Sequence, residues 1–313
     1  MSKEEGIEKV AVIGAGLMGL GIGVEFARFG YPVSLYNTRE ASSQDARERA
    51  IEDLDLMAET GLISKDEAKA AFDRCTFTTD LEEAATGADY VVESVLEMLS
   101  LKHEVFTQLD RICPPPAILT TNTSAIRVTE IATVAKNPER IVIAHYFQPP
   151  HFVPLVEVVA GEKTDPEVVD KTARILRGLR KKVVVLPIEL PGFAGNRIQG
   201  AIAREVRSLV DQGVCTPEMV DDIIQFGFGR RMAYTGYFKR SDLIGLDFGS
   251  RGRETRREGM WKPVAEHLER GELGMKSGRG FYDWSGDKAK NFLRDYNTEL
   301  IRLMKRDMDA GLI

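Results

Sequence analysis

A glycine-rich segment near the start of the chain constrains the fold more than any other feature. The sequence GAGLMG, residues 14–19, follows a short apolar run at residues 9–14 and opens a stretch of helical pattern. In such a unit the first glycine permits a tight turn, the second lets the backbone approach a pyrophosphate, and the third allows close packing of helix on strand. The free N–H groups of the helix N-terminus then face the phosphate charge. The predicted dinucleotide-binding residues here are Gly14, Gly16, Leu17, Met18 and Gly19.

The end of the second apolar run, residues 32–37, bears on the choice of cofactor. An enzyme that uses NAD usually places Asp or Glu there to bind the ribose 2′-hydroxyl. Here the run ends in Asn37, Thr38 and Arg39. Asn37 carries no charge to repel a 2′-phosphate, and Arg39 can pair with one. These three residues are expected to contact the cofactor and to favour NADP over NAD. The alternative is a solvated Arg39, with Glu40 replacing the missing acid.

Short apolar runs alternate with helical stretches along the first 190 residues. Further strands are predicted within residues 88–95, 117–121, 141–145, 155–161 and 181–187. Residues 40–72 are charged and helical in pattern, with a break near Gly61. Such alternation implies a parallel sheet with helices on both faces. We therefore predict an α/β fold, with a doubly wound, mostly parallel Rossmann domain over residues 1–190. An all-α domain is expected over residues 191–313, since the chain after Pro191 is mostly helical in pattern.

Composition excludes several classes of protein. The chain has 313 residues, of which 43% are hydrophobic and 29% charged, and its net charge is −6. This charge argues against a nucleic-acid partner, which favours a basic face. No run of about 18 apolar residues exists, so no membrane partner is expected, and the charged N-terminus does not resemble a secretory signal. The cysteines Cys75, Cys113 and Cys215 form no CxxC pair, which predicts a reducing, cytoplasmic location and no metal site.

One histidine stands where catalysis by a Rossmann enzyme takes place. Oxidation of a secondary alcohol needs a base for the hydroxyl proton, and histidine suits this near neutral pH. His145 ends a predicted strand at the carboxyl edge of the sheet, where open α/β sheets bind ligands. Glu157 lies twelve residues later in an apolar strand and needs a partner, because an unpaired buried charge is costly. We predict that Glu157 orients His145 and stabilises its imidazolium form.

Four further segments carry a resemblance to a known family. They are residues 122–126 (NTSAI), 145–158 (HYFQPPHFVPLVEV), 191–198 (PGFAGNRI) and 241–247 (SDLIGLD). With the glycine-rich start, they resemble the 3-hydroxyacyl-CoA dehydrogenase family from residue 10 to about residue 284. The resemblance implies the same His–Glu dyad and a homodimer formed through the helical domain.

The resemblance also implies roles for individual residues. Ser124 and Asn196 match residues that hold the substrate oxygen, where they can polarise a carbonyl. Glu97 matches a glutamate near the nicotinamide, and Lys102 matches a lysine that contacts the cofactor ribose. Asn122 is expected beside the nicotinamide ribose. Without the resemblance, Ser124 would be an ordinary candidate for a helix N-cap.

Other segments bear on the substrate. The usual family string HFFNP is replaced by HYFQPP at residues 145–150, and residues 228–236 form an arginine-bearing stretch in place of a shorter loop. Both features resemble a subgroup that handles small free 3-hydroxy acids: L-gulonate 3-dehydrogenase, lambda-crystallin and carnitine dehydrogenase. Arg231 is the candidate to bind a substrate carboxylate, and a solvated arginine is the alternative.

The evidence on coenzyme A is divided. Acyl-CoA members of the family carry lysines for the CoA phosphates in the hairpin after the second strand, whereas residues 53–71 are acidic here, with Lys65 and Lys69 only late in the segment. By contrast, residues 241–247 and 274–284 look closer to 3-hydroxybutyryl-CoA enzymes. A small acid or a short acyl group is therefore favoured over a long chain.

Taken together, these patterns predict reversible interconversion of a 3-hydroxy and a 3-oxo group by hydride transfer with NADP or NAD. The expected substrate is a short 3-hydroxyacyl-CoA or a small 3-hydroxy acid. A lysine-based beta-hydroxyacid dehydrogenase shares the N-terminal glycines but lacks the pair formed by His145 and Glu157. A non-catalytic protein, crystallin-like or NADPH-sensing, is the alternative from another class, and the intact set of candidate catalytic residues argues against it.

Overall fold

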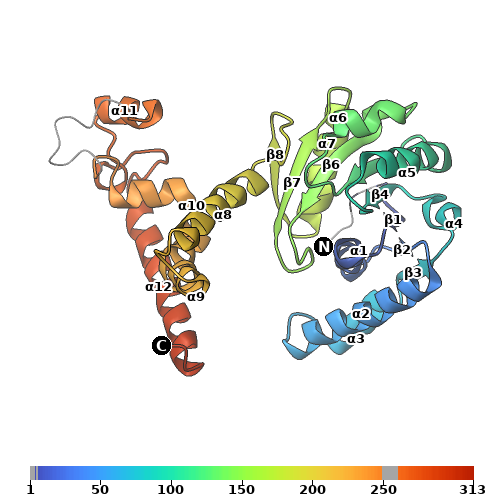
Figure 1. Cartoon of the computed structure of the whole chain (residues 1–313), viewed down its shortest axis with the longest axis horizontal. Coiled ribbons are helices and arrows are strands. Elements are labelled where there is room, and N and C mark those ends of the chain that lie inside the picture. Colours follow the sequence, from blue (N-terminus) through green and yellow to red (C-terminus); the bar gives the residue numbers. More distant parts are fainter. Residues whose placement is uncertain (1–3, 5, 249–259) are drawn as a thin grey trace. The chain divides into compact units, whose positions relative to one another are not determined.

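The computed structural model describes residue 4, residues 6–248 and residues 260–313. The chain divides into two compact units, Met1–Ile202 and Ala203–Ile313, which are described separately (Figure 1). The division falls within helix α8 (Gly195–Asp211), later than the predicted boundary at residue 190. The reason is that residues just after 190 still contribute to the first unit: Phe193 is 1% exposed and packs in its core.

The first unit is built on a single eight-stranded sheet in the order β3-β2-β1-β4-β5-β6-β7-β8. The strands are β1 (Val10–Ile13), β2 (Val33–Tyr36), β3 (Cys75–Thr78), β4 (Tyr90–Glu93), β5 (Ile118–Thr121), β6 (Ile141–Tyr146), β7 (Leu155–Ala160) and β8 (Lys182–Leu186). All neighbours pair in parallel except β6 and β7, which are antiparallel. The predicted mostly parallel Rossmann sheet is confirmed. Strand β3 has no counterpart among the predicted strands, because it is a short, half-exposed edge strand with a weak apolar pattern.

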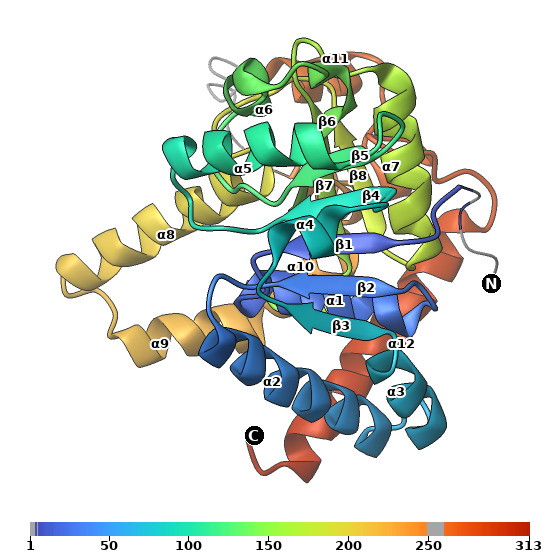
Figure 2. The ribbon, with the colours of Figure 1, turned by 90° about the vertical axis from the view of Figure 1, so that its right-hand side faces the viewer.

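Helices cover both faces of this sheet (Figure 2). They are α1 (Leu17–Arg28), α2 (Glu40–Glu59), α3 (Lys65–Phe72), α4 (Leu81–Ala85), α5 (Leu99–Ile112), α6 (Val128–Ile131) and α7 (Pro166–Gly178). Alternate residues of β1 point to opposite faces. Val10 and Val12 join the apolar core formed with α1, α2, α3 and α7, while Ala11 and Ile13 join the core formed with α4, α5 and α6. Burial on both faces explains why the strands appear as continuous apolar runs.

Helices α2 and α3 form a hairpin beside β3, at one edge of the sheet (Figure 2). Helix α2 ends at Glu59, and Gly61 adopts a positive φ of 75°, at the break predicted from the sequence. Helix α3 begins with a capping box, in which the Ser64 side chain accepts from the Glu67 N–H and the Glu67 carboxylate accepts from the Ser64 N–H.

The second unit is helical, which confirms the predicted all-α domain. Its elements after α8 are α9 (Pro217–Asp222), η3 (Ile223–Phe228), α10 (Gly229–Ile244), α11 (Lys262–Glu269), η5 (Met275–Ser277) and α12 (Lys288–Asp309). The glycine-rich segment before α12 is organised by a buried carboxylate. Asp242 accepts hydrogen bonds from the N–H groups of Phe281 and Tyr282 and from the Trp284 indole. These bonds give an irregular segment one defined path.

Candidate active site

A cavity of about 1140 Å³ opens at the carboxyl ends of β1, β4, β5 and β6, wholly within the first unit. Its lining residues are Gly16, Leu17, Met18, Ser94, Val95, Leu96, Asn122, Ser124, His145, Tyr146, Phe147, Gln148, Pro149, Val153, Leu155, Gly195, Asn196, Ile198 and Gln199. No lysine, arginine, aspartate or glutamate occurs among these described lining residues. The cavity therefore brings the glycine-rich loop together with the predicted catalytic residues at the edge where such sheets bind ligands.

His145 and Glu157 face each other across the antiparallel pair β6–β7. The His145 Nδ1 lies 2.9 Å from a Glu157 oxygen, and the two residues are 4% and 2% exposed. The second Glu157 oxygen accepts the Gly195 N–H at 2.8 Å. Burial alone would raise the pKa of Glu157, but the hydrogen bonds from His145 and Gly195 outweigh it and hold this pKa below its usual value. An ionised Glu157 makes Nδ1 the donor, which leaves Nε2 of His145 to exchange a proton.

Two aromatic rings hold the His145 imidazole in place. Its centroid lies 4.7 Å from that of Phe147 and 5.2 Å from that of Phe193. Phe193 has a positive φ of 48°, which is uncommon for a bulky residue and tends to persist only where the surroundings enforce it, often at functional sites. The imidazole is thus fixed by packing as well as by its hydrogen bond.

Ser124 and Asn196 meet at the cavity. The Asn196 side-chain amide donates to the Ser124 carbonyl oxygen at 3.1 Å, and both residues line the cavity. The N-cap of the following helix α6 is Arg127, so the alternative of Ser124 as its N-cap is wrong. The Asn122 side chain joins neighbouring strand ends, since its Oδ1 accepts the Tyr146 N–H and its Nδ2 donates to the Ser94 hydroxyl.

Glu97 organises the turn that carries Ser124. One of its carboxylate oxygens accepts the N–H groups of Ser124 and Ala125, both at 3.0 Å, and the hydroxyl of Thr123. Burial would raise the pKa of Glu97, but these donors and the nearby Lys102 charge hold it below its usual value. Glu97 lies outside the cavity lining and contacts the site through this turn.

Lys102, for which the resemblance implies a ribose contact, forms a buried ion pair with Glu93. Its side chain is 1% exposed, and its Nζ lies 2.8 and 2.9 Å from the two oxygens of Glu93 and 3.4 Å from Glu97. Glu93 ends β4 completely buried and needs a cation, which α5 supplies. The sequence carried a signal for this pair: Glu93, like Glu157, is an acid in an apolar strand.

The dinucleotide loop has the geometry expected of it. Gly14 has a positive φ of 98°, and a Cβ on Gly19 would lie 2.1 Å from the Gly14 carbonyl oxygen, so neither position accepts a side chain without strain. A Cβ on Gly16 would meet nothing within 4 Å, which leaves open space before the N-terminus of α1. These features fit a pyrophosphate bound at a helix N-terminus.

The residues after β2 lie outside the cavity lining. Asn37 is 9% exposed, and its side-chain amide donates to the Ser42 carbonyl in the first turn of α2. Thr38 and Arg39 are exposed, and the Arg39 side chain forms no ion pair with any described residue. Arg231 lies in α10 of the second unit; its Nε is buried without a hydrogen-bond partner among the described residues.

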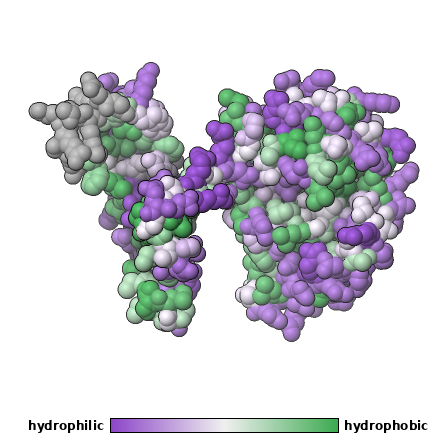
Figure 3. All heavy atoms as spheres, viewed as in Figure 1, coloured by the Kyte–Doolittle hydropathy of each residue, from purple (hydrophilic) through white to green (hydrophobic). Residues whose placement is uncertain are grey.

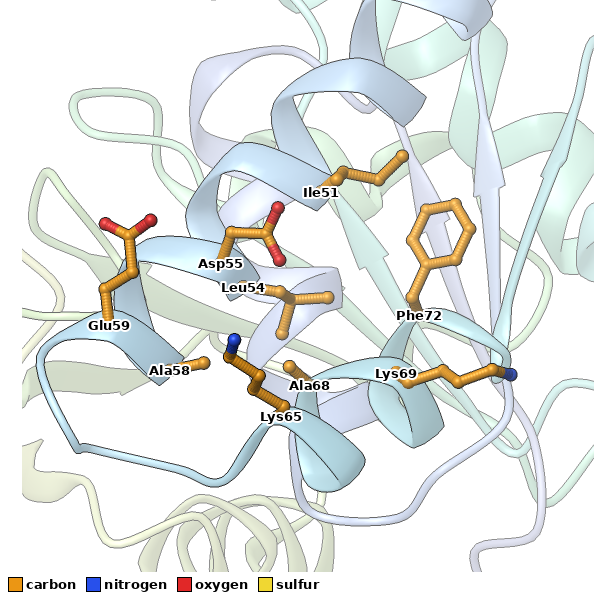
Figure 4. A pocket seen from close by; sticks show the side chains of 9 residues that line it. All are labelled: Ile51, Leu54, Asp55, Ala58, Glu59, Lys65, Ala68, Lys69 and Phe72. Atoms are coloured by element: carbon orange, nitrogen blue, oxygen red, sulfur yellow. The ribbon is translucent and has the colours of Figure 1, made fainter.

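A second cavity, of about 500 Å³, lies between α2 and α3 (Figure 4). Its apolar lining residues are Ile51, Leu54, Ala58, Ala68 and Phe72. Asp55 and Glu59 of α2 and Lys65 and Lys69 of α3 also line it. Residues 40–72 contain nine acidic and four basic residues, so this hairpin carries five of the six net negative charges of the chain.

Family models match most of the chain. Residues 9–189 match the NAD binding domain of 3-hydroxyacyl-CoA dehydrogenase, and residues 192–284 match its C-terminal domain. The chain belongs to the 3-hydroxyacyl-CoA dehydrogenase family. It is therefore an oxidoreductase with an NAD-binding Rossmann domain.

The names of individual relatives refer to different classes of substrate. A 5-formyl-3-hydroxy-2-methylpyridine 4-carboxylate 5-dehydrogenase of Mesorhizobium japonicum is 31% identical over 96% of this chain and 98% of its own. A probable 3-hydroxybutyryl-CoA dehydrogenase of Bacillus subtilis is 35% identical over 89% and 98%. An L-carnitine dehydrogenase of Oceanobacillus iheyensis is 35% identical over 78% of each chain. The crystal structure of a 3-hydroxyacyl-CoA dehydrogenase from Archaeoglobus fulgidus has a TM-score of 0.76 at 31% identity, covering 98% of this chain and all of that one.

No described helix is both long and apolar enough to span a membrane. No group of three or more metal-binding side chains comes together among the described residues.

Proposed function

We propose that this protein interconverts a 3-hydroxy and a 3-oxo group on a small substrate, with His145 as the general base in oxidation and the general acid in reduction. The observation that carries this proposal is the buried hydrogen bond from His145 Nδ1 to Glu157 beside a cavity that also contains the dinucleotide loop. When bound, the nicotinamide would accept or supply the hydride. The residues Gly14, Gly16, Leu17, Met18 and Gly19 would hold the dinucleotide.

The residues of this chain manage the proton and the oxygen. In oxidation, Nε2 of His145 takes the hydroxyl proton, and Glu157 stabilises the resulting imidazolium through Nδ1. The side chains of Ser124 and Asn196 orient the substrate oxygen and, in reduction, polarise the carbonyl. Glu97 keeps Ser124 in position by binding the N–H groups of its turn. Correct placement of both reactants supplies much of the rate.

Substitution of the histidine tests this assignment. We expect His145→Gln to lower kcat by about 10²- to 10⁴-fold, because it removes the general base, while the dissociation constant of the reduced cofactor stays unchanged. Turnover is measured by cofactor absorbance, and cofactor binding by fluorescence. His103→Gln is the matched control, since His103 bonds the Glu130 carbonyl away from the cavity and its loss should leave kcat unchanged. Full activity of His145→Gln would refute the assignment.

We further propose a preference for NADP over NAD. Asn37 brings no charge to the end of β2, and the nearby Arg39 guanidinium is exposed and free of ion pairs with described residues. Both features favour a 2′-phosphate. Glu40, which begins α2, supports the opposing choice of a 2′-hydroxyl.

Removal of the Arg39 charge tests whether the protein prefers NADP or NAD. Arg39→Ala is expected to weaken NADPH binding by about tenfold, the loss of one charge-assisted hydrogen bond, and to leave NADH binding unchanged. Fluorescence titration of each reduced cofactor measures both constants. Arg49→Ala is the control and should change neither constant, since Arg49 is a partly exposed arginine paired with Asp45 on the same helix. Equal effects of Arg39→Ala on both cofactors would contradict the proposal.

For the substrate, we propose a small 3-hydroxy acid or short acyl group, with the free acid favoured over a CoA ester. The acidic hairpin α2–α3 would repel the phosphates of coenzyme A. The cavity lining offers no cation for a free carboxylate. Arg231 is our candidate for that role, because its guanidinium has no ion-pair partner among the described residues and its Nε is buried and unbonded.

Three 3-oxo substrates distinguish these possibilities: acetoacetate, acetoacetyl-CoA and acetoacetyl-N-acetylcysteamine, a thioester without phosphates. We expect kcat/KM for the CoA ester not to exceed that for the short thioester. Arg231→Met should raise KM about tenfold for the acid alone. Arg294→Met, an exposed arginine of α12, is the control. A kcat/KM for acetoacetyl-CoA tenfold above that for acetoacetate would overturn the preference for the free acid. L-gulonate and carnitine extend the panel in the oxidative direction.

We propose that the protein is a homodimer formed through its helical unit. Helix α8 has no buried residue, and Val214, Met219 and Ile223 are each more than half exposed. In α12, Ile301, Met304 and Met308 are equally exposed, and Figure 3 shows apolar surface on this unit. Light scattering of the full chain should give twice the 34.8 kDa of one chain. Replacing Met219 and Ile223 by Glu should give the single-chain mass, and a monomeric wild-type protein would contradict the proposal.

We also propose a reducing, cytoplasmic location. The three cysteines are free thiols. Burial raises the pKa of Cys75 to about 12 and that of Cys113 to about 11, so both remain in the unreactive thiol form.

A further inference from the structure

We propose that Lys181 and Gly21 are positioning residues that fix the substrate-side wall of the cavity by docking the β6–β7 loop, residues 147–154, onto helix α1. This inference rests on the proposed function. The loop supplies Phe147, Gln148, Pro149 and Val153 to the cavity lining and begins two residues after His145.

Lys181 holds the loop by its backbone. The Lys181 Nζ donates to the carbonyl oxygens of Pro150 at 2.6 Å and Val153 at 3.3 Å. The same Nζ lies 3.2 Å from a carboxylate oxygen of Glu25 on α1. An ammonium group has three donors, and these three oxygens account for all of them.

This attachment is buried on every side. The side chains of Lys181 and Glu25 are 3% and 2% exposed, so the ion pair is shielded from solvent. The other Glu25 oxygen is bonded to Arg28 at 2.9 Å. A buried, fully bonded lysine that lies outside the cavity lining can act on the reaction only through the segments it bonds, which are the loop and helix α1.

Gly21 is the position on α1 against which the loop packs. A Cβ at this position would lie 2.4 Å from the His151 Nδ1 and 2.8 Å from the Pro150 Cγ. Gly21 is not part of the GAGLMG loop, and its absent side chain is what allows helix and loop to approach this closely. The His151 side chain is 7% exposed, and its Nε2 lies 3.5 Å from the Asp53 carboxylate on α2.

The loop in turn packs against the catalytic group. The Phe147 ring contacts the His145 imidazole, and a Cβ on Gly195 would lie 2.4 Å from the Phe147 ring. A displacement of the loop by a fraction of an ångström therefore moves a ring that packs against both the imidazole and the start of α8. A shift of about 1 Å at a reacting centre can cost about 10²-fold in rate.

Two variants and one control test the proposal on the full-length protein. Lys181→Met removes the ammonium and leaves Glu25 bonded to Arg28, and Gly21→Ala pushes the loop away while favouring the helix. Lys182→Met is the control, because Lys182 is the exposed neighbour of Lys181. The measurements are cofactor affinity, kcat and KM for the best 3-oxo substrate, and hydrogen exchange of residues 147–154 by mass spectrometry.

We expect Lys181→Met and Gly21→Ala to bind the reduced cofactor within about twofold of wild type, to exchange faster in the loop, and to lose about 10- to 100-fold in kcat/KM. Unchanged exchange in the loop, or faster exchange with unchanged kcat and KM, overturns the proposal. If Lys181→Met does not fold, Gly21→Ala decides. A wild-type protein without turnover on any substrate would refute the proposed function instead, and loop exchange would still test the docking.

Discussion

The antiparallel pairing of β6 with β7 is the constraint on which the site depends. It sets His145 opposite Glu157 in register and buries both. A buried carboxylate must be fully bonded, and Glu157 meets this need with the imidazole on one oxygen and the Gly195 N–H on the other. The same carboxylate thus orients the His145 ring and fixes the start of α8, where Asn196 lines the cavity. Removal of its charge would loosen both together.

Two other buried acids follow the same rule close to the cavity. Glu93 takes Lys102 as its cation, and Lys102 also reaches Glu97, which holds the turn of Ser124. Glu25 takes Lys181, which holds the β6–β7 loop. In each case a buried ion pair is linked to backbone groups of a cavity-lining segment. Buried pairs of this kind add little net stability, and their effect here is to restrict the positions of the segments they bond.

Much of this arrangement could be predicted from the sequence, because the type and spacing of some residues indicate their structural environment. The glycine spacing at residues 14–19 predicts the turn and the helix N-terminus, and the acid in the apolar strand at Glu157 predicts a buried partner. The acid in the apolar strand at Glu93 likewise predicts a buried cation, but only the packing of α5 on the sheet shows that this cation is Lys102. The role of Lys181 could not be predicted, because it donates to backbone carbonyls, which every residue type carries.

The bonding of Glu97 has a consequence for how reactivity in this cavity can change. The N–H groups of Ser124 and Ala125 both point to that carboxylate, so neither is available to a developing negative charge on a substrate oxygen. In the proposed reaction, stabilisation of that charge would fall to side chains: the Ser124 hydroxyl, the Asn196 amide and the imidazole. A site whose donors are backbone N–H groups keeps them when a side chain is substituted. Here each donor belongs to a side chain, so one substitution removes it. Single substitutions can therefore tune or abolish the chemistry one donor at a time, which gives this scaffold a direct route to new substrates.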